Sequence, residues 1–492
     1  MNKQAILIMV DTQSATMLQL YNEAGVPCPN ISRIAQNGAV FQNGYTVSPV
    51  CGPARSALFT GQYPSTNGVW ANGQQLGQDI QNAAQRLMPA GVPCAYIGKW
   101  HLDGGDYFGK GTCAPGYDPN YWYDMRNFVD ELPNDDTRKF SRKNMGSIMF
   151  GEIKEEDTYA HRVTERALKY IREHKDEDFF LTVSFDEPHD PSQCPKAFIS
   201  ELNKTGFKIK DYPNTNASLK DKPDIQKMWA DAFKIPWPFL KMGFQKGFFP
   251  CNYFVDYEIG RILDAIDALK DPMIIYTADH GDMQNAHGLM AKGPAMYEEI
   301  THVPYIIKGG PFRNRNITTP VSHIDILPTV MEFFGLQKPR MLEGHSLYSI
   351  GDDDSREIYM QFGRFEAEVD GYLGFMPIRS VFDGRYKLNI NLFSTDELYD
   401  LENDPYETKN LINDKALAKL RDALHDKIIA HQNEIVDPFR GYPWECRPWR
   451  KGKKPSFTNA GCTRQRCEDG TTRYDYATGC PVTSEVRAKG MK

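Results

Sequence analysis

The chain lacks a long apolar run, and this sets the first limit on its class. No stretch of its 492 residues approaches the ~20 consecutive apolar residues that a membrane-spanning helix needs. The apolar run at residues 5–10 is too short for a signal-peptide core with its cleavage site, and it predicts a buried strand. As the sequence stands we expect a cytoplasmic protein without a membrane partner, or a periplasmic or secreted one if a signal has been removed.

A surplus of basic residues is missing as well. The formal net charge of -7 argues against a nucleic-acid binder, which would need a basic face, and against docking to an anionic membrane. An overall negative charge still allows a locally positive anion-binding site. We therefore expect no nucleic-acid partner, while an anionic small molecule remains compatible with this composition.

The chain also lacks a tight cysteine pattern. Its ten cysteines are scattered, so a chain of this length needs no disulfide framework. Four of them gather near the C-terminal end: Cys446, Cys462, Cys467 and Cys480. A zinc site there is an alternative, but the spacing fits no common zinc template, and we favour unpaired thiols. We find no internal repeat.

What is present is the composition of an ordinary globular protein, with 41% hydrophobic and 25% charged residues, long enough for one large and one smaller domain. Strand and helix patterns alternate up to about residue 335, which predicts an α/β fold with a mostly parallel sheet and helices on both faces. The expected strands include 6–10, 94–97, 179–185 and 273–277, and the expected helices 31–37, 158–174, 253–269 and 323–334. Residues 192–250 interrupt this alternation as an insertion near the site.

The pattern changes after residue 356. Short strand patterns at 358–362, 378–382 and 386–392, with Asp383-Gly384 as a hairpin turn, are followed by a helical pattern at 416–433. We therefore predict two domains: a catalytic α/β domain over 1–355, and a smaller domain over 356–492 with an antiparallel sheet, a helix and an irregular tail.

One segment carries most of the functional information. Cys51-Gly52-Pro53-Ala54-Arg55 is followed by an apolar pair and Thr60-Gly61. The alternative interpretation of Cys51 is a buried structural thiol without a catalytic role. The flanking Pro53 and Arg55 instead resemble the sulfatase signature Cys-X-Pro-X-Arg, in which a dedicated maturing enzyme oxidises the cysteine to formylglycine. The resemblance implies a formylglycine nucleophile at position 51, a formylglycine-generating or anaerobic sulfatase-maturating enzyme as partner, and Arg55 holding the hydrated aldehyde through charge-assisted hydrogen bonds.

A hydrated aldehyde suits this chemistry because it has two hydroxyl groups on one carbon. One attacks the sulfate ester and displaces the alcohol, and the other then re-forms the aldehyde and expels sulfate. The segment 91–101 resembles the second signature of the family, although Cys94 stands where Ser or Thr is usual. By this match Lys99 binds a sulfate oxygen and His101 hydrogen-bonds the formylglycine.

Metal-ligating residue types follow two of the expected strands. Asp11 ends the first strand, and Asp279 and His280 follow the strand 273–277, so they are expected at one edge of the sheet. The family resemblance implies that Asp11, Cys51, Asp279 and His280 bind a divalent metal. Many relatives carry a second Asp where this chain has Thr12, and Asn where it has His280; we still favour Ca2+, with Mn2+ or Mg2+ open. Gln13 is the first candidate for the missing oxygen, and Thr12 the weaker one.

Two further segments match family motifs. Pro188-His189-Asp190-Pro191 resembles the family's Pro-His-X-Pro loop, which makes His189 the general acid for the departing alcohol oxygen, although a structural cap is the alternative. The segment from His287 to Lys292 matches another block, which makes Lys292 the second sulfate-binding cation. Asp282 and His287 are weaker candidates.

The family match covers most of the chain and implies the alkaline phosphatase-like fold. It also implies hydrolysis of a small-molecule or oligosaccharide sulfate ester, with the closest resemblance to uncharacterised or carbohydrate-directed bacterial sulfatases. Two rivals remain: a phosphodiester or phosphonate monoester hydrolase of the same superfamily, and a non-catalytic sugar-sulfate-binding protein. Specificity is expected in the loops 103–150, 192–250 and 363–375, which the general motifs do not cover.

Overall fold

The larger sheet has seven strands in the order β4-β5-β1-β6-β7-β2-β8. The structure, a computed structural model, describes residues 2–132, 153–232, 237–366 and 374–453, without the side chains of 237–245. The strands are β1 (Gln4–Val10), β2 (Ala39–Phe41), β4 (Cys94–Gly98), β5 (Phe179–Ser184), β6 (Met273–Ala278), β7 (Tyr305–Lys308) and β8 (Arg315–Ile317). Its pairs are parallel except for those of β7, which runs against both β6 and β2. A further parallel pair joins β3 (Gly44–Tyr45) to β9 (Val321–Ser322).

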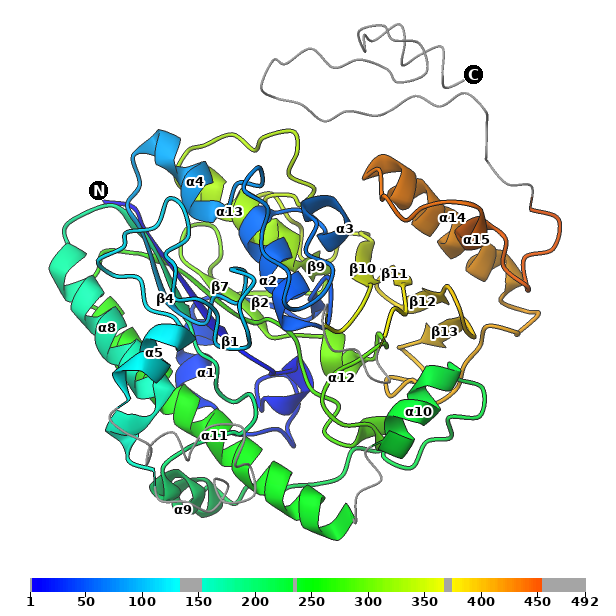
Figure 1. Cartoon of the computed structure of the whole chain (residues 1–492), viewed down its shortest axis with the longest axis horizontal. Coiled ribbons are helices and arrows are strands. Elements are labelled where there is room, and N and C mark those ends of the chain that lie inside the picture. Colours follow the sequence, from blue (N-terminus) through cyan, green and yellow to red (C-terminus); the bar gives the residue numbers. More distant parts are fainter. Residues whose placement is uncertain (1, 133–152, 233–236, 367–373, 454–492) are drawn as a thin grey trace, which may run out of the picture.

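Helices cover both faces of this sheet (Figure 1). On one face, α1 (Pro29–Gln36), α8 (Tyr159–His174) and α11 (Trp237–Ile266) share a core with Ile6, Ile8 and Val10 of β1. On the other, α2 (Cys51–Thr60), α4 (Ala83–Leu87) and α13 (Ile326–Phe333) share a core with Ala5, Leu7 and Met9. The alternating residues of β1 thus face opposite cores, which explains its uninterrupted apolar sequence.

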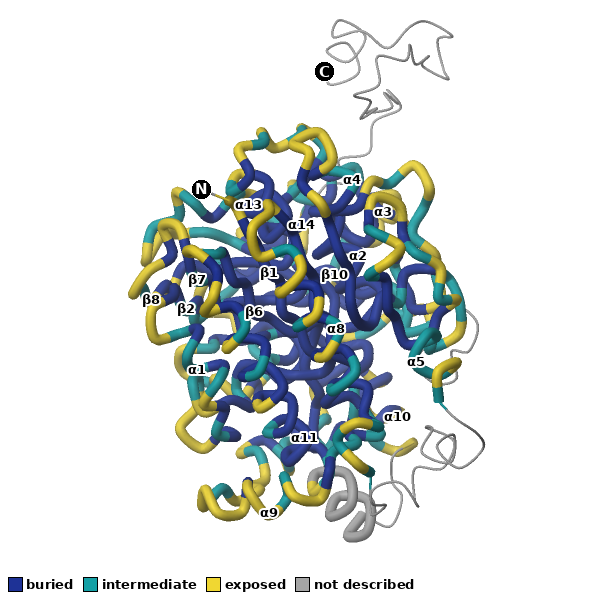
Figure 2. The backbone as a smooth tube through the Cα atoms, turned by 90° about the vertical axis from the view of Figure 1, so that its left-hand side faces the viewer, coloured by how far each residue is buried: buried dark blue, intermediate teal, exposed yellow. Residues whose placement is uncertain are grey.

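The other described helices that precede the second sheet are short. They are α3 (Pro64–Asn67), α5 (Met125–Glu131), α9 (Lys196–Lys204), α10 (Asp224–Ala232), α12 (Glu298–Thr301), and the 3-10 turns Ala15–Met17, Met88–Ala90, Glu155–Asp157, Ala286–Gly288 and His323–Asp325. Figure 2 shows the central strands buried and the exposed segments at the periphery.

A second, antiparallel sheet follows in the C-terminal part. Its strands β10 (Ile358–Phe362), β11 (Ile378–Phe382), β12 (Tyr386–Asn391) and β13 (Glu397–Asp400) pair in sequence order, and α14 (Ala418–Glu434) with α15 (Tyr442–Glu445) packs on it (Figure 1). The predicted fold class, a mostly parallel sheet with helices on both faces and a smaller antiparallel sheet, is confirmed. The domain boundary at residue 355 stays a prediction.

One expectation about a single element was wrong. Helix α11 begins at Trp237 rather than at residue 253, with Pro250 inside the helix. Pro and Gly lower the helix propensity of 237–250, so only tertiary packing extends the helix over this part. Residues 192–250, expected as an insertion near the site, contain α9, α10 and the start of α11.

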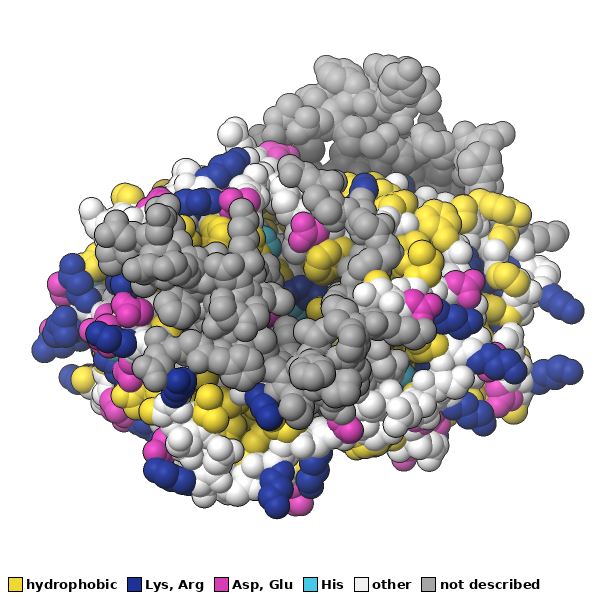
Figure 3. All heavy atoms as spheres, turned by 60° about the horizontal axis from the view of Figure 1, so that its bottom comes forward, with side chains coloured by type: hydrophobic (Ala, Val, Ile, Leu, Met, Phe, Trp, Pro, Cys, Tyr) yellow, Lys and Arg dark blue, Asp and Glu magenta, His cyan; other side chains and the backbone are white. Residues whose placement is uncertain are grey.

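The described surface is mixed in charge. On the face drawn in Figure 3, Lys and Arg side chains are interspersed with Asp and Glu. Among the described residues, no helix is both long and apolar enough to cross a bilayer. The described cysteines, Cys446 included, form no disulfide, while Cys462, Cys467 and Cys480 lie outside the described residues.

Candidate active site

The candidate site lies where four neighbouring parallel strands end. Strands β4, β5, β1 and β6 are adjacent and parallel, so the residues that follow them meet at one edge of the sheet. Lys99 and His101 follow β4, His189 follows β5, Asp11 follows β1, and Asp279 and His280 follow β6. Cys51 joins them as the first residue of α2.

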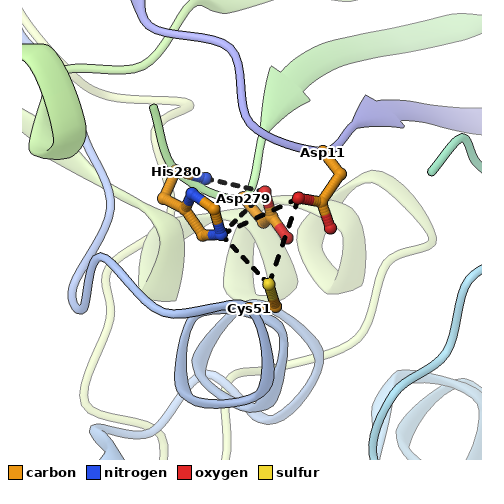
Figure 4. A group of neighbouring side chains, drawn as sticks. All are labelled: Asp11, Cys51, Asp279 and His280. Carbon is orange, nitrogen blue, oxygen red and sulfur yellow. Dashed lines mark hydrogen bonds and ion pairs between the residues drawn. The ribbon is translucent and has the colours of Figure 1, made fainter. Parts of the chain in front are cut away.

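The four residues predicted as metal ligands lie together (Figure 4). One donor atom from each of Asp11, Cys51, Asp279 and His280 lies within 4.8 Å of the others, and all four residues are buried. The Cys51 Sγ atom is 3.2 Å from Nε2 of His280, and that nitrogen is 3.8 Å from Oδ1 of Asp11. Two carboxylates and an imidazole around a common point are a donor set that suits a divalent cation.

Arg55 forms ion pairs with both carboxylates of this group. Its Nη2 is 3.0 Å from Oδ2 of Asp11 and its Nε is 3.1 Å from Oδ2 of Asp279. Burial alone would lower the pKa of Arg55, but the two carboxylates outweigh it and raise the pKa, so the guanidinium stays charged. The described hydrogen bonds of Arg55 go to these carboxylates, to Lys99 O and to Ser184 Oγ rather than to Cys51. Arg55 therefore contacts two of the predicted ligands, and its hydrogen bonds to the hydrated formylglycine stay a prediction.

Cationic side chains surround Cys51. Burial and Asp11 raise the pKa of its thiol, but Lys292, Lys99 and His280 outweigh them and hold it well below the ordinary value. The N-terminus of α2 adds partial positive charge at the same place. The position of Cys51 is therefore built to stabilise negative charge.

The two lysines have different neighbours. Lys99 Nζ lies 2.7 Å from Oδ2 of Asp11 and 2.8 Å from Oδ1 of Asp186. Lys292 Nζ lies 3.1 Å from Nε2 of His189. Burial lowers the pKa of Lys99, but the two aspartates outweigh it and raise the pKa well above its usual value. Both ammonium groups are buried cations beside Cys51.

The two predicted catalytic histidines have different partners. Burial lowers the pKa of His101, and a hydrogen bond to Cys51 opposes that shift. His189 places Nδ1 2.9 Å from the carbonyl oxygen of Asp190, which leaves Nε2 facing Lys292, 4.0 Å from Oδ1 of Asp11. A neutral His189 would thus carry its proton on Nδ1 and accept from Lys292.

Thr12 and Gln13 have different partners. The Gln13 amide donates to Asn252 at 2.7 Å and accepts from Tyr276 at 2.6 Å. Thr12, with φ at 66°, turns its hydroxyl to 2.6 Å from Oδ1 of Asp11. Which of the two supplies the missing oxygen stays a prediction.

The two weaker candidates, Asp282 and His287, have different surroundings. Burial raises the pKa of Asp282, against the opposing charges of Lys292 and His189, so this carboxyl lies close to the cations. His287 instead stacks on Tyr297 with ring centroids 4.0 Å apart and bonds to Asn214 at 3.0 Å. Burial lowers the pKa of His287 to about 3, so it is a neutral packing residue.

Sequence reasoning missed three residues of the site. Asp186 and Tyr107 both contact Lys99, and Asn72 Oδ1 accepts from the backbone N–H of Gly52 at 2.8 Å. Asp186 lies three residues before His189, so the motif that contains His189 could have pointed to Asp186. Tyr107 and Asn72 lie in segments without a motif, and only the folded chain brings them to the site.

Comparison with known proteins identifies the family. The sulfatase family model matches residues 3–336, which is more than half of the chain. The chain belongs to the sulfatase family. This sulfatase is therefore a hydrolase of sulfuric ester bonds. The model for the C-terminal region of N-sulphoglucosamine sulphohydrolase matches residues 286–434.

Relatives and neighbours agree with this assignment. The uncharacterized sulfatase YidJ of Escherichia coli is 38% identical over 99% of this chain and 98% of its own length. N-acetylglucosamine-6-O-sulfatase of Bacteroides thetaiotaomicron is 25% identical over 88% of this chain and 86% of its own. Among solved structures, the phosphonate monoester hydrolase of Silicibacter pomeroyi has a TM-score of 0.73 at 19% identity, covering 89% of this chain and 96% of that one. The last likeness concerns the fold alone.

Proposed function

We propose that this sulfatase removes sulfate from a carbohydrate, with formylglycine at position 51 as nucleophile and a divalent cation beside it. The observation that carries the proposal is the position of Cys51: at a helix N-terminus, among buried cations, within 4.8 Å of the predicted metal ligands. An anionic ester and an anionic transition state both require such surroundings.

The nucleophile requires a modification of Cys51. A two-electron oxidation of the CH2–SH group by the maturing enzyme and its oxidant, followed by hydrolysis that releases hydrogen sulfide, leaves an aldehyde. Water then adds to give two hydroxyls on one carbon. One hydroxyl oxygen bonds to sulfur as the S–O bond to the alcohol breaks; the second loses its proton, the C=O bond re-forms, and sulfate leaves. His101, bonded to residue 51, is placed to take a proton from the diol.

Asp11, Asp279 and His280, together with residue 51, would hold the cation. When bound, it supplies positive charge that favours a deprotonated hydroxyl and the sulfate oxygens. The donor set fits a divalent ion because two buried carboxylates lie side by side. Burial and the neighbouring Asp11 carboxylate raise the pKa of Asp279 when no metal charge is present. Oxygen donors favour Ca2+ and leave Mg2+ open, while the imidazole of His280 keeps Mn2+ as a further alternative.

The remaining residues divide the substrate between them. Lys99 and Lys292 bind the sulfate oxygens, since both ammonium groups stand beside Cys51. In its protonated form His189 gives the departing alcohol oxygen the proton on Nε2, the nitrogen that faces the site, and returns to the neutral ring with its proton on Nδ1. A carbohydrate is proposed because the N-acetylglucosamine-6-O-sulfatase of Bacteroides thetaiotaomicron is related along most of this chain.

A phosphonate monoester or phosphodiester hydrolase is the second candidate. The fold likeness to the phosphonate monoester hydrolase and the Asp279-His280 pair favour it. Turnover of 4-nitrophenyl sulfate and of an aryl phosphate diester by the same modified enzyme separates the two candidates. A kcat/KM higher for the sulfate supports the sulfatase assignment, and the reverse order overturns it.

The nucleophile is tested by mass spectrometry and substitution. In protein co-produced with a maturing enzyme, the peptide around Cys51 should be lighter by about 18 mass units, the difference between CH2–SH and CHO. Cys51→Ala should abolish sulfate release while the protein keeps its thermal unfolding midpoint. Full activity of protein whose Cys51 remains a thiol would overturn the mechanism, and so would activity of the alanine variant. A sugar-sulfate-binding protein without catalysis predicts binding but no turnover.

A further inference from the structure

Tyr107 brings an aromatic ring from the segment after β4 into the group of cations. Its hydroxyl donates to Oδ1 of Asp186 at 2.5 Å and accepts from Lys99 Nζ at 3.0 Å. Its ring centroid lies 4.4 Å from that same nitrogen. The side chain is only partly buried, whereas the two charged groups that it contacts are buried.

The hydroxyl is one of three described partners of Lys99. The Lys99 Nζ atom lies within hydrogen-bond distance of an oxygen of Asp11, of Asp186 and of Tyr107. Two partners are carboxylates, and Asp186 is itself held by the tyrosine. Loss of the Tyr107 hydroxyl would therefore change the geometry of both the lysine and the carboxylate that orients it.

The ring faces the side of the site where the alcohol leaves. Its centroid is 5.4 Å from the ring of His189 and 5.7 Å from that of His101. A general acid stands beside the oxygen that it protonates, so the organic group attached to this oxygen must lie next to His189. A partly exposed aromatic ring at this distance offers that group an apolar face.

We infer that Tyr107 is a positioning and specificity residue of this sulfatase: its hydroxyl holds the Lys99 ammonium, and its ring lines the place of the alcohol that carries the sulfate. The inference rests on the proposed function and extends it to the loop after β4. The two halves of the side chain are separable, because Tyr107→Phe removes only the hydroxyl and Tyr107→Ala removes the ring as well.

The experiment uses the modified enzyme with 4-nitrophenyl sulfate as substrate and inorganic sulfate as the second probe. Tyr107→Phe should weaken sulfate binding and lower kcat, each on the order of 10-fold, the scale of one hydrogen bond from a neutral group to a charged group. Tyr107→Ala should raise the KM for the ester by a further factor of roughly 3–10, with no further loss in sulfate affinity, because sulfate does not reach the ring.

Phe108→Ala is the matched control. Phe108 lies in the same loop and also packs on the core, but its described ring contacts are with Tyr107 and Arg126 rather than with the catalytic cations. Sulfate affinity is measured by calorimetry, which needs no turnover. Unchanged kinetics and sulfate affinity in both Tyr107 variants would overturn the inference alone, as would an equal effect of Phe108→Ala. Wild-type enzyme that neither turns over the ester nor binds sulfate would overturn the proposed function, and the inference with it.

Discussion

At the scale of single residues, the site is a balance of buried charges. Asp11 shows this best: burial raises its pKa, but Lys99, His189, Lys292 and Arg55 outweigh burial and hold it well below the usual value. Each carboxylate has a cation in contact, and each lysine has a distinct set of neighbours. Because the two lysines and His189 stand at different places around Cys51, their contributions can be measured separately.

Lys99 and His189 should differ in how they depend on the leaving group. An alkyl alcohol is a poor leaving group and needs a proton, whereas a phenolate leaves readily. His189→Ala should therefore slow hydrolysis of a sugar sulfate by a factor in the ~10²–10⁴ range of general acid catalysis and affect an aryl sulfate far less. Lys99→Ala should slow both substrates by ~10²–10³, the scale of a lost electrostatic donor.

The measurement is kcat/KM of both variants on both substrates. If His189→Ala slowed the two esters equally, His189 would not be the general acid, and His101 or a bound water would become the better candidate. A Lys99→Ala variant that lost only sugar sulfate activity would contradict the sulfate-binding role.

At the scale of elements, the end of β4 decides where Lys99 lies. Gly98 has φ at 127°, and a Cβ added there would stand 1.9 Å from the carbonyl oxygen of Ser184 in β5. The next residue, Lys99, donates its backbone N–H to that same oxygen at 2.9 Å. Close contact of the two strand ends therefore requires glycine, and it brings Lys99 next to the residues that follow β5.

Gly98→Ala should destabilise the protein by at least about 2–3 kcal/mol, since it combines a clash with backbone strain. Gly91→Ala, just before β4, is the control: φ is 69° there but nothing lies within 4 Å of the added Cβ, so only about 1–2 kcal/mol of strain is expected. Urea unfolding followed by circular dichroism measures both free energies of unfolding. Equal losses in the two variants would show that the approach of β4 to β5 is not as tight as the structure has it.

At the scale of the whole molecule, a buried ion cluster joins the antiparallel sheet to α12. Lys387 of β12 is fully buried and lies 2.8 Å from Oε1 of Glu298 in α12 and 2.8 Å from Oε1 of Glu407. Burial lowers the pKa of Lys387, but the two carboxylates outweigh it and raise the pKa. The backbone N–H of Glu298 also donates to Glu407 at 2.7 Å. These ion pairs and this hydrogen bond connect the antiparallel sheet to the segment that follows Lys292 and Tyr297.

Lys387→Met should cost about 3–5 kcal/mol of stability, because it removes the buried ammonium that two buried carboxylates contact. Arg385→Met is the control on the same strand region: its side chain is 42% exposed and pairs with Asp400 and Glu402, so about 0–1 kcal/mol is expected. The midpoint of thermal unfolding compares the two variants. If Lys387→Met lowered the unfolding midpoint no more than the control, the cluster would not stabilise the contact between the antiparallel sheet and α12.

The sequence could predict much of the site because the relevant residues are local signals. Asp11 and Asp279 each end an apolar strand, and strand ends meet at one edge of a parallel sheet. Tyr107 could not be predicted in the same way, because it lies in a loop without a motif and its partner Asp186 is 79 residues away. Sequence distance also hid the contacts of Arg55 with two carboxylates, which are 44 and 224 residues away.

The sequence by itself determined the family and the class of fold. The Cys51 segment is a contiguous motif, and buried strands such as β1 must be apolar on both faces wherever they lie. Only the tertiary structure decided the direction of β7, the pairing of Gln13 with Asn252 and Tyr276, and the contact of Tyr107 with Asp186. These outcomes depend on packing between distant segments, in which many weak contacts act together and no single stretch of sequence carries the information.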